Sequence, residues 1–288
     1  MQKETYCAIL KTGDYMKKKI LFDYRDDILY LHHTLTLDPA TDDFSFKSHS
    51  HNMVEVYYFL RGNAHFVVEG DIFNLERGNV LVMASGQTHH LLLEPSVVYE
   101  RMALLIDTAS VPASFDSLQE KLYRGAHHFV LTKNEQTWFE ESFALIGKVA
   151  ADVRQSAALS FANMVFSLLF TKLTPMTEPN IHDDSIKKAI NYINKNLANP
   201  LSLESISGAL YCSKGSLNRK FREIMGCTVW EYVIRRRIYS ARQYLSLGGS
   251  LSDAYQKSGF CDYSSFFRAY KKVVGISPSA DMKKLKAN

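Results

Sequence analysis

The last third of the chain contains two segments of similar pattern, and this repeat limits the fold more than any other feature. The first segment, LSLESISGALYCSKGSLNRKFREIMG, begins at Leu201, and the second, SLSDAYQKSGFCDYSSFFRAYKKVVG, begins at Ser250. In each, a short apolar stretch, a turn and a polar residue precede a longer stretch that ends in glycine. Each segment therefore predicts two helices joined by a three- or four-residue turn, with Ser213 and Asp262 as the N-caps of the second helices.

A long helix is predicted between the two units. Apolar residues recur at helical spacing in TVWEYVIRRRIYSARQYLSL, from Thr228 to Leu247, and the two glycines that follow end the pattern. A further helix precedes the first unit, because Ile186, Ile190 and Ile193 also recur at helical spacing. Residues 185–288 are therefore expected to form an all-α domain with two helix-turn-helix units joined by a long helix.

The charge of the chain is distributed unevenly along its length. Residues 183–288 hold 18 Lys and Arg against 8 Asp and Glu, whereas residues 1–182 hold 16 against 22. A basic segment joined to an acidic one is typical of a nucleic-acid-binding module attached to a domain with another task. A basic face that only meets solvent would have the same balance, so the charge alone does not decide between the two.

The second helix of each unit has an apolar face and an opposite polar, basic face. Hydroxyl, amide and guanidinium groups near the start of such a helix suit base edges in the major groove, and later Lys and Arg suit phosphates. A plain helical hairpin also has a polar outer face, but two basic units separated by a long helix favour DNA binding. The predicted DNA-contacting residues are Lys214, Gly215, Ser216, Asn218, Arg219 and Arg222 in the first unit and Tyr263, Ser264, Ser265, Arg268, Lys271 and Lys272 in the second.

The front of the chain has a different period. From Ile28 to Ile106 apolar and polar residues alternate, with turn signals between the runs, which predicts an antiparallel β-barrel or sandwich. Two amphipathic helices follow, over 135–151 and 155–173, and are expected to cover the barrel. Residues 174–184 carry prolines without periodicity. We therefore expect an α+β chain of two domains, 1–173 and 185–288, with 174–184 as a linker.

Targeting and redox signals are absent from the sequence. No segment approaches the roughly 20 apolar residues that a membrane span needs, so no membrane partner and a cytoplasmic location are expected. The four cysteines, Cys7, Cys212, Cys227 and Cys261, form no C-x-x-C pair and are expected to be reduced.

The last third resembles the DNA-binding domain of the AraC/XylS family of transcription regulators. The resemblance lies in SISGALYCSKGSLNRKFREIMG, RRRIYSARQYL and above all SGFCDYSSFFRAYKKVVGISP, and covers about residues 185–282. It implies two recognition helices in successive major grooves of double-stranded promoter DNA, an activator rather than a repressor, RNA polymerase as a possible further partner, and a homodimer. It also implies a small-molecule effector, such as a sugar or related metabolite.

One part of the second unit departs from the family pattern. Ala254 stands where the family usually has isoleucine, Tyr255 where it has alanine, and Ser258 where it has an apolar residue. A tyrosine in place of a small residue predicts altered helix packing. We therefore expect the second unit to contact phosphates rather than to recognise bases.

The front domain resembles the two motifs of the cupin barrels that many members of this family place ahead of the DNA-binding domain. His49, His51, Glu55 and Gly62 match the first motif, and Gly78, Gly86 and His89 match the second. The sequence departs from the motif at Ala84 and Leu93, where cupins have proline and asparagine. In metal-binding cupins the ligands are the three histidines and the glutamate. His49 and His51 lie two apart and so share one strand face, which is compatible with a common site, whereas the neighbour of His89, His90, is expected at the surface.

Three uses of this cluster are compatible with the sequence. The histidines can be inert strand residues, they can hold a divalent metal such as Zn, Fe, Mn or Ni, or they can form a polar pocket for an effector. We expect no required cofactor and an effector site of His49, His51, Glu55, Tyr57 and His89, with His49, His51, Glu55 and His89 as the alternative metal ligands. The chain is expected to be a regulator and not an enzyme. The alternatives are a metal-dependent cupin enzyme with a nucleic-acid-binding appendage, and an effector-independent regulator whose barrel only dimerises.

Overall fold

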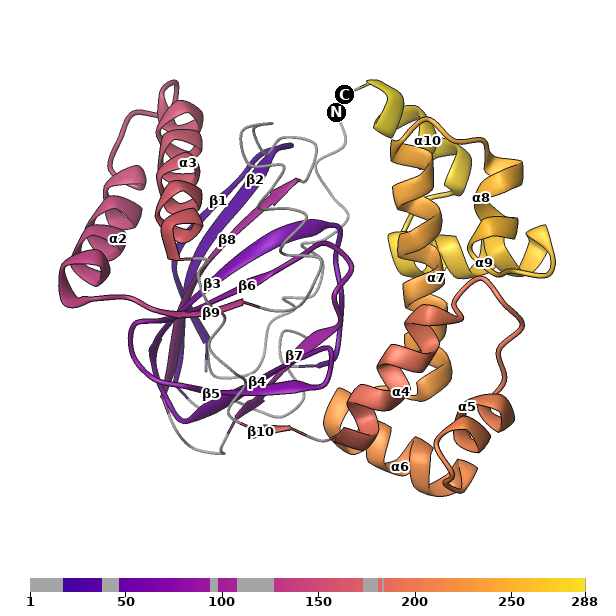
Figure 1. Ribbon diagram of the computed structural model, residues 1–288. Helices are drawn as coiled ribbons and strands as arrows, with labels where there is room; N and C mark the ends of the chain where they lie inside the picture. Colours follow the sequence, from indigo (N-terminus) through magenta and orange to yellow (C-terminus); the bar gives the residue numbers. More distant parts are fainter. Residues whose placement is uncertain are drawn as a thin grey trace, which may run out of the picture.

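The computed structural model describes residues 18–37, 47–93, 98–107, 127–172, 181–182 and 184–287. They form a β-rich front domain and a helical second domain, which lie side by side (Figure 1). The front domain consists of β1 (Lys18–Arg25), β2 (Leu29–Thr36), β3 (Met53–Arg61), β4 (Ala64–Val68), β5 (Asp71–Leu75), β6 (Asn79–Met83), β7 (His89–Leu93), β8 (Tyr99–Asp107), β9 (His127–Val130), α2 (Lys133–Ile146) and α3 (Arg154–Lys172). The remaining elements are β10 (Ile181–His182), α4 (Asp184–Lys195), α5 (Leu203–Ala209), α6 (Lys214–Met225), α7 (Val229–Ser246), α8 (Leu251–Lys257), α9 (Tyr263–Val274) and α10 (Pro278–Ala287).

The strands form two antiparallel sheets. One has the order β1-β2-β8-β3-β6-β9 and the other β10-β5-β4-β7. Aromatic and aliphatic side chains from both sheets fill the space between them, among them Tyr57, Phe66 and Phe73. The α+β architecture expected from the sequence, an antiparallel β domain followed by a helical one, is therefore confirmed.

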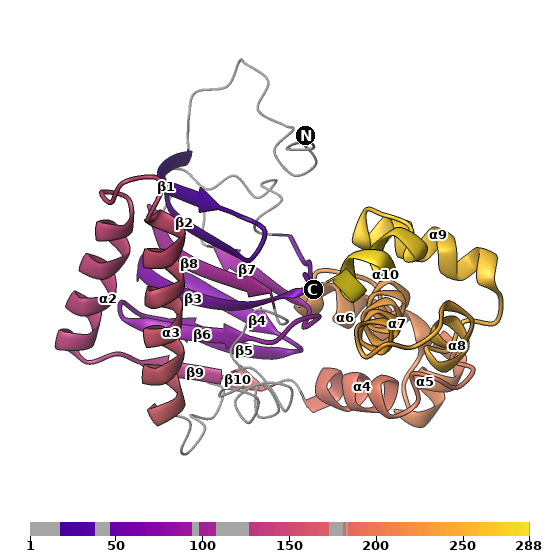
Figure 2. The ribbon, with the colours of Figure 1, turned by 90° about the horizontal axis from the view of Figure 1, so that it is seen from above.

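The period of two in the strands reflects two different environments. On β3, Val54, Val56 and Tyr58 pack against α2 and α3, whereas Tyr57 and Phe59 face the other sheet. Figure 2 shows α2 and α3 side by side over the outer face of the six-stranded sheet, as expected from their apolar stripes. Both faces of β3 are therefore buried.

The helical domain contains the two predicted units at opposite ends of α7. The α5–α6 pair forms the first unit and the α8–α9 pair the second (Figure 1). Ser213 accepts a hydrogen bond from the backbone N–H of Ser216 at the start of α6, and Asp262 accepts one from Ser265 at the start of α9. Gly226 and Gly275 end these helices in left-handed conformation, which glycine adopts without steric cost. The predicted caps are therefore confirmed.

The first unit shares its apolar core with the front domain. Val67 of β4 belongs to the same buried cluster as Ile190 of α4, Phe221 of α6 and Tyr232 of α7. Gly70, in the turn after β4, lies so close to α4 that an added Cβ would stand 3.0 Å from the side chain of Ile190. The second unit has its own core, built around Phe266 and Tyr270, with no residue of the front domain among those described.

The segment expected as a linker is only partly described. Residues 173–180 and 183 lie outside the described residues, and Ile181 and His182 form β10, which pairs with Ile72 and Asp71 of β5. The chain therefore passes from one domain to the other along the edge of the four-stranded sheet. Among the described residues, no helix has the length and apolar character that a bilayer span requires.

Candidate functional site

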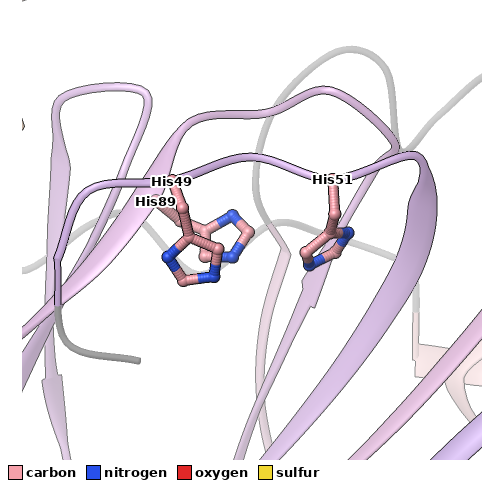
Figure 3. Close-up of side chains that lie close together, drawn as sticks. All are labelled: His49, His51 and His89. Carbon is pink, nitrogen blue, oxygen red and sulfur yellow. The ribbon is translucent and has the colours of Figure 1, made fainter. Parts of the chain in front are cut away.

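Three histidines, His49, His51 and His89, meet at the edge of the barrel that faces the helical domain, and we call them the histidine cluster. His49 and His89 form an antiparallel bridge in which each backbone N–H donates to the other residue's carbonyl, at 3.0 and 2.9 Å. Their rings are 4.4 Å apart, and the rings of His51 and His89 are 5.0 Å apart. Figure 3 shows the rings of His49 and His89 beside each other and that of His51 to one side of them. One ligand nitrogen from each of the three lies within 4.8 Å of the others.

The backbone orients all three rings in the same way. The Nδ1 of His49 lies 2.7 Å from the carbonyl oxygen of Lys47, that of His51 lies 3.1 Å from Met53 O, and that of His89 lies 2.9 Å from Gln87 O. A carbonyl can only accept, so each Nδ1 donates. The Nε2 atoms of His49 and His89 are therefore the ones directed at a ligand, whereas the Nε2 of His51 is already engaged by the Glu55 carboxylate at 2.8 Å.

Glu55 completes the histidine cluster from β3. Its Oε2 lies 2.8 Å from the Nε2 of His51 and 3.4 Å from that of His89. Burial alone would raise the pKa of Glu55, but the hydrogen bonds and charges of His51 and His89 outweigh it and hold the pKa well below its ordinary value. The carboxylate is therefore ionised, and it supplies the negative charge of the site.

The cluster has the donor set of a divalent transition-metal site. Metal-binding histidines usually donate their second ring N–H to a carbonyl or carboxylate, as all three do here. Burial and the neighbouring His89 lower the pKa of His49 to about 3, which keeps that ring neutral at physiological pH. The buried Nε2 of His89 has, among the described residues, only the long 3.4 Å contact with Glu55 Oε2 as a polar partner. These groups fit a metal ion, and they equally fit the hydroxyl of a polar ligand.

His90 is buried, so the prediction that it lies at the surface is wrong. Only 4% of it is exposed, and neither ring nitrogen has a hydrogen-bond partner among the described residues. The alternation along β7 does direct it away from His89, but the face opposite the barrel interior is covered by the helical domain, where Gly226 lies beside the His90 ring. The surface prediction failed because it took no account of that domain.

Tyr57, which the sequence analysis includes in the expected effector site, lies on the inner face of β3. Its hydroxyl contacts that of Tyr99, and burial, together with Tyr99, raises its pKa well above the ordinary value. Arg101, which the sequence reasoning missed, lies beside it, with the guanidinium 5.5 Å from the centre of the Tyr57 ring and 3.8 Å from Glu55 Oε1. The signal in the sequence was an arginine among alternating strand residues, on the same face of its strand as Tyr99.

The predicted DNA-contacting residues of the first unit lie on one open face. Lys214, Gly215, Ser216, Arg219 and Arg222 are exposed. A groove of about 590 Å³ runs along this face between α5 and α6. It is lined by Leu203, Glu204, Lys214, Gly215, Asn218, Arg219, Arg222 and Glu223.

On this face two glutamates pair with basic side chains, and Asn218 is bonded to the start of α7. Lys214 Nζ lies 2.6 Å from Glu204 Oε1, and Arg219 Nη1 lies 3.1 Å from Glu223 Oε1. Exposed pairs of this kind contribute about 0–1 kcal/mol, so a phosphate can displace the carboxylate. Asn218 differs, because its Oδ1 accepts a hydrogen bond from the backbone N–H of Val229 at the start of α7. Its carbonyl oxygen is thus already used within the protein.

The second unit presents an equivalent surface on α9. Ser264, Arg268, Lys271 and Lys272 are exposed, Tyr263 is 42% exposed, and Ser265 is half-buried. In the segment that departs from the family pattern, Tyr255 packs edge-on against Tyr263 at 5.8 Å. The Ser258 hydroxyl is buried and donates to Ala254 O at 2.7 Å. The tyrosine thus fills space between α8 and α9, and the serine hydroxyl bonds a carbonyl oxygen near the C-terminal end of α8.

Helix α7 connects this domain directly to the segment that carries the histidine cluster. Tyr239 donates its hydroxyl to Ser50 O at 2.8 Å, and Arg235 Nη1 donates to Ser48 Oγ at 3.3 Å. Tyr232 donates to the Glu69 carboxylate, and its own pKa is raised well above the ordinary value by burial and by Glu69. Ser48 and Ser50 are the residues on either side of His49. We call these three pairs the α7 latch.

The turn that precedes His89 is also held by α7. Arg236 Nη1 donates to Gly86 O at 3.4 Å, and the ring of Tyr239 lies so close to Gly86 that an added Cβ would stand 2.9 Å from it. Gly86 N in turn donates to His51 O at 2.8 Å. Both chain segments of the histidine cluster therefore touch α7, which sequence spacing alone could not reveal.

Comparison with known proteins identifies relatives of both domains. The profile described as "AraC-like ligand binding domain" matches residues 35–161, and that described as "Helix-turn-helix domain" matches residues 206–284. The HTH-type transcriptional activator RhaR of Enterobacter sp. (strain 638) is 27% identical over 247 residues, which are 81% of this chain and 86% of the relative. RhaR of Escherichia coli O139:H28 is 23% identical over 252 residues, with the same coverage. The solved structure of ToxT from Vibrio cholerae O395 is 14% identical, covers 95% of this chain and 100% of its own, and has a TM-score of 0.40.

The relatives decide between two of the sequence-based alternatives. They are transcription activators, and they match across both domains of this chain. The expectation of a DNA-binding regulator that is not an enzyme is thereby confirmed, and the alternative of a metal-dependent cupin enzyme is not supported.

Proposed function

Since the chain belongs to the AraC family of transcription regulators, we propose that it is a sequence-specific activator whose promoter contact is controlled by a sugar or related metabolite bound in the front barrel. The observation that carries the proposal is the α7 latch. One helix touches the segments of the histidine cluster and also supports both recognition helices. A change at the ligand site can therefore reach the DNA-binding surface through direct contacts.

The recognition helices α6 and α9 enter successive major grooves on one side of the DNA. Helix α7 has 18 residues and so spans about 27 Å, close to the roughly 34 Å between successive major grooves. The DNA-contacting set is Lys214, Gly215, Ser216, Asn218, Arg219, Arg222, Tyr263, Ser264, Ser265, Arg268, Lys271 and Lys272. Asn218 contributes its amide N–H groups, because its oxygen caps α7. The second unit contacts phosphates more than bases.

The effector site consists of His49, His51, Glu55, Tyr57 and His89. Imidazole nitrogens, a carboxylate and a phenol recognise hydroxyl groups, and the aromatic inner faces of the sheets suit a sugar ring. A divalent metal held by His49, His51, Glu55 and His89 is the second candidate occupant, favoured by the common orientation of the three Nδ1–H groups. When bound, such an ion would supply a Lewis-acidic centre for ligand oxygens.

Assembly and location complete the proposal. The chain acts as a cytoplasmic homodimer divided into domains 1–173 and 185–288, with RNA polymerase as a partner at the promoter. An apolar groove of about 160 Å³ between α2 and α3, with Leu145 59% and Met164 56% exposed beside it, supports these helices as the dimer contact. Two copies on one promoter double the DNA contacts and set the spacing of the half-sites.

Replacing His49 and His51 together by glutamine will abolish the response to effector without weakening DNA binding. The two imidazoles lie in the proposed ligand site and are not among the proposed DNA-contacting residues, so affinity for a duplex selected from a random pool should stay within about twofold. The response is measured with a reporter behind that duplex and a panel of sugars. Metal content, measured on the same preparations, should equal that of the parent protein if no metal occupies the site.

A matched control is His65→Gln. His65 lies on β4 but on the outer face, where its Nδ1 meets Asn74 Oδ1 at 2.6 Å. It should leave the response intact. A double variant that still responds would place the cluster among inert strand histidines, and one equivalent of metal in the parent that the double variant lacks would favour the metal candidate.

Breaking the α7 latch with Tyr232→Phe and Tyr239→Phe will raise reporter expression in the absence of effector. Each hydroxyl bond contributes about 1 kcal/mol, so losing both shifts the ratio of docked to undocked molecules by about 30-fold. We assign the docked arrangement, in which the latch holds the segment of His49 against α7, to the uninduced state. Basal reporter expression with no added sugar is the measurement.

Tyr244→Phe is the control for the latch. Tyr244 also lies on α7, but its hydroxyl bonds to Asp253 and Lys257 of the second unit. It should leave basal expression unchanged. Basal expression that falls or stays constant in the double latch variant would reverse the assignment of the docked state or remove the latch from regulation.

A further inference from the structure

The inner face of β2 and β8 carries a row of polar groups that the proposed effector site does not use. Leu29 and Leu31 of β2 pack against α2 and α3, so the even-numbered residues of that strand face the barrel interior. Thr34 lies directly opposite Arg101 of β8 in the strand register, and Thr36 lies opposite Tyr99. Arg101 in turn lies opposite Phe59 of β3, on the inner face.

Arg101 has unused hydrogen-bonding capacity. A guanidinium has five N–H donors. Among the described residues, no hydrogen bond joins the Arg101 guanidinium to another residue, although its backbone pairs with β2 and β3. Its ion pair with Glu55 is 3.8 Å long, and 13% of the side chain is exposed. A buried arginine is usually satisfied by a carboxylate or by carbonyls at about 2.7–2.9 Å. This one is held in place by the Tyr57 ring and is still reached by solvent.

Two threonines on the same inner face of β2 also have unused hydrogen-bonding groups. Thr34, opposite Arg101 in the register, is 5% exposed, and Thr36, opposite Tyr99, is 3% exposed. Neither Oγ1 has a hydrogen-bond partner within the described structure, and an unsatisfied buried hydroxyl costs about 1–3 kcal/mol. Two such hydroxyls on one inner face with an arginine whose guanidinium makes no hydrogen bond within the described structure therefore indicate a site completed by a ligand.

We infer that the barrel takes a polyhydroxy monocarboxylate, of the uronic- or aldonic-acid type, with its carboxylate on Arg101 and its hydroxyls on Thr34 and Thr36. This inference rests on the proposed function, in which the effector binds in the barrel, and it names the chemical class. The planar fork of a guanidinium matches a carboxylate with two parallel bonds.

The charges around Arg101 favour one negative charge on the ligand. The Glu55 carboxyl group already lies 3.8 Å from the guanidinium, so a ligand carboxylate would share one cation with it. A phosphate dianion would bring twice the charge to the same cation, at a larger desolvation cost. A neutral sugar would leave the fork of Arg101 without its best partner.

Matched ligand pairs test the inference on the full-length protein. Glucose and glucuronate, and galactose and galacturonate, differ in one carboxylate, and glucose 6-phosphate is the phosphate arm. We expect a uronate to raise the melting temperature and to bind in calorimetry, with its neutral partner and the phosphate ester at least tenfold weaker. Arg101→Lys, which keeps the charge but not the fork, should weaken the uronate at least tenfold.

Two further variants complete the test. Thr34→Val removes one hydroxyl with little change of shape and should weaken the uronate about fivefold, corresponding to one hydrogen bond. Arg61→Lys, on the exposed end of β3 with 55% of its side chain accessible, should have no effect. Because Thr34→Val is conservative, it tests the site even if Arg101→Lys fails to fold.

Four outcomes would overturn the inference. The first two are that a neutral sugar binds as tightly as its uronate and that only the phosphate ester binds. The other two are that no carboxylate binds and that a carboxylate binds the Thr34→Val protein with unchanged affinity. Affinity for the selected DNA duplex, measured on the same preparations with and without ligand, separates these results from a failure of the proposed function. A neutral sugar that changes DNA affinity would support the proposed regulatory function and contradict only the inferred carboxylate of the ligand.

Discussion

Replacing Arg219 and Arg222 together by alanine will weaken binding to the selected promoter duplex by about 30-fold or more, since each arginine–DNA contact contributes roughly 1–3 kcal/mol. Both side chains are exposed on the outer face of α6 and line the groove of the first unit. The exposed ion pair of Arg219 with Glu223 contributes little to stability, so the domain should stay folded. Fluorescence anisotropy at two salt concentrations measures the loss, and a shallower salt dependence is expected because cationic contacts to phosphates are removed.

Lys148→Ala is the control for removing a basic side chain elsewhere on the surface. Lys148 is exposed in the connection between α2 and α3, on the front domain. Its removal lowers the net charge by one but should leave DNA affinity within about twofold. Unchanged affinity and unchanged sequence preference in the double arginine variant would mean that the first recognition surface lies elsewhere.

Removing the carboxylate of Asp281 will destabilise the second unit by about 3–5 kcal/mol, because a buried cation is left unpaired. Asp281 of α10 is 2% exposed. It accepts bonds from Arg242 Nε at 2.5 Å and Nη2 at 3.2 Å, and from the Tyr270 hydroxyl at 2.7 Å. It therefore joins α7, α9 and α10 at a single point. Asp281→Ala should lose α9-dependent DNA contacts together with stability.

Urea unfolding followed by circular dichroism measures this loss of stability. Asp253→Ala is the control, because Asp253 lies exposed on α8 and accepts only a 3.2 Å bond from the Tyr244 hydroxyl. Its cost should stay below about 1 kcal/mol. A comparably small cost for Asp281→Ala would show that solvent or a rearranged neighbour satisfies Arg242.

Local features of the fold could be predicted well from the sequence. Ser213 and Asp262 are predicted as N-caps because a short polar residue just before a helical apolar pattern usually accepts a hydrogen bond from the first turn of the helix. The long helix was predicted from Thr228 to Leu247, and the structure places these two residues as the caps of α7. Such signals depend on neighbours within a few residues, so they survive in any tertiary context.

The candidate site was predicted only in part, for a physical reason. His49, His51, Glu55 and His89 do meet, as the motif resemblance implied. For Arg101, alternation along β8 shows only that it shares a face with Tyr99. It does not say which face is inside when both are covered, so its role could not be assigned. His90 was misplaced for the same reason.

The contacts between the domains were beyond the reach of sequence patterns. Tyr232, Arg235 and Tyr239 read as ordinary polar positions of a solvated helix, and their partners lie more than 150 residues away in the chain. Nothing in local spacing distinguishes a tyrosine that meets solvent from one that meets the backbone of another domain. Only the assembled structure shows that α7 serves two domains at once.

Because the core around Val67 and Gly70 is shared with the first helix-turn-helix unit only, the two units are held in position by different parts of the protein. The first unit is built into the sensor, so its position is set by the barrel. The second is attached through α7 and Asp281, so its position is set by the length and stiffness of one helix. Lengthening α7 would therefore rotate and displace the second unit on the promoter while the first stayed in register with the sensor. The position of the first unit on the promoter is thus fixed relative to the front domain, and the position of the second unit depends on the length of α7.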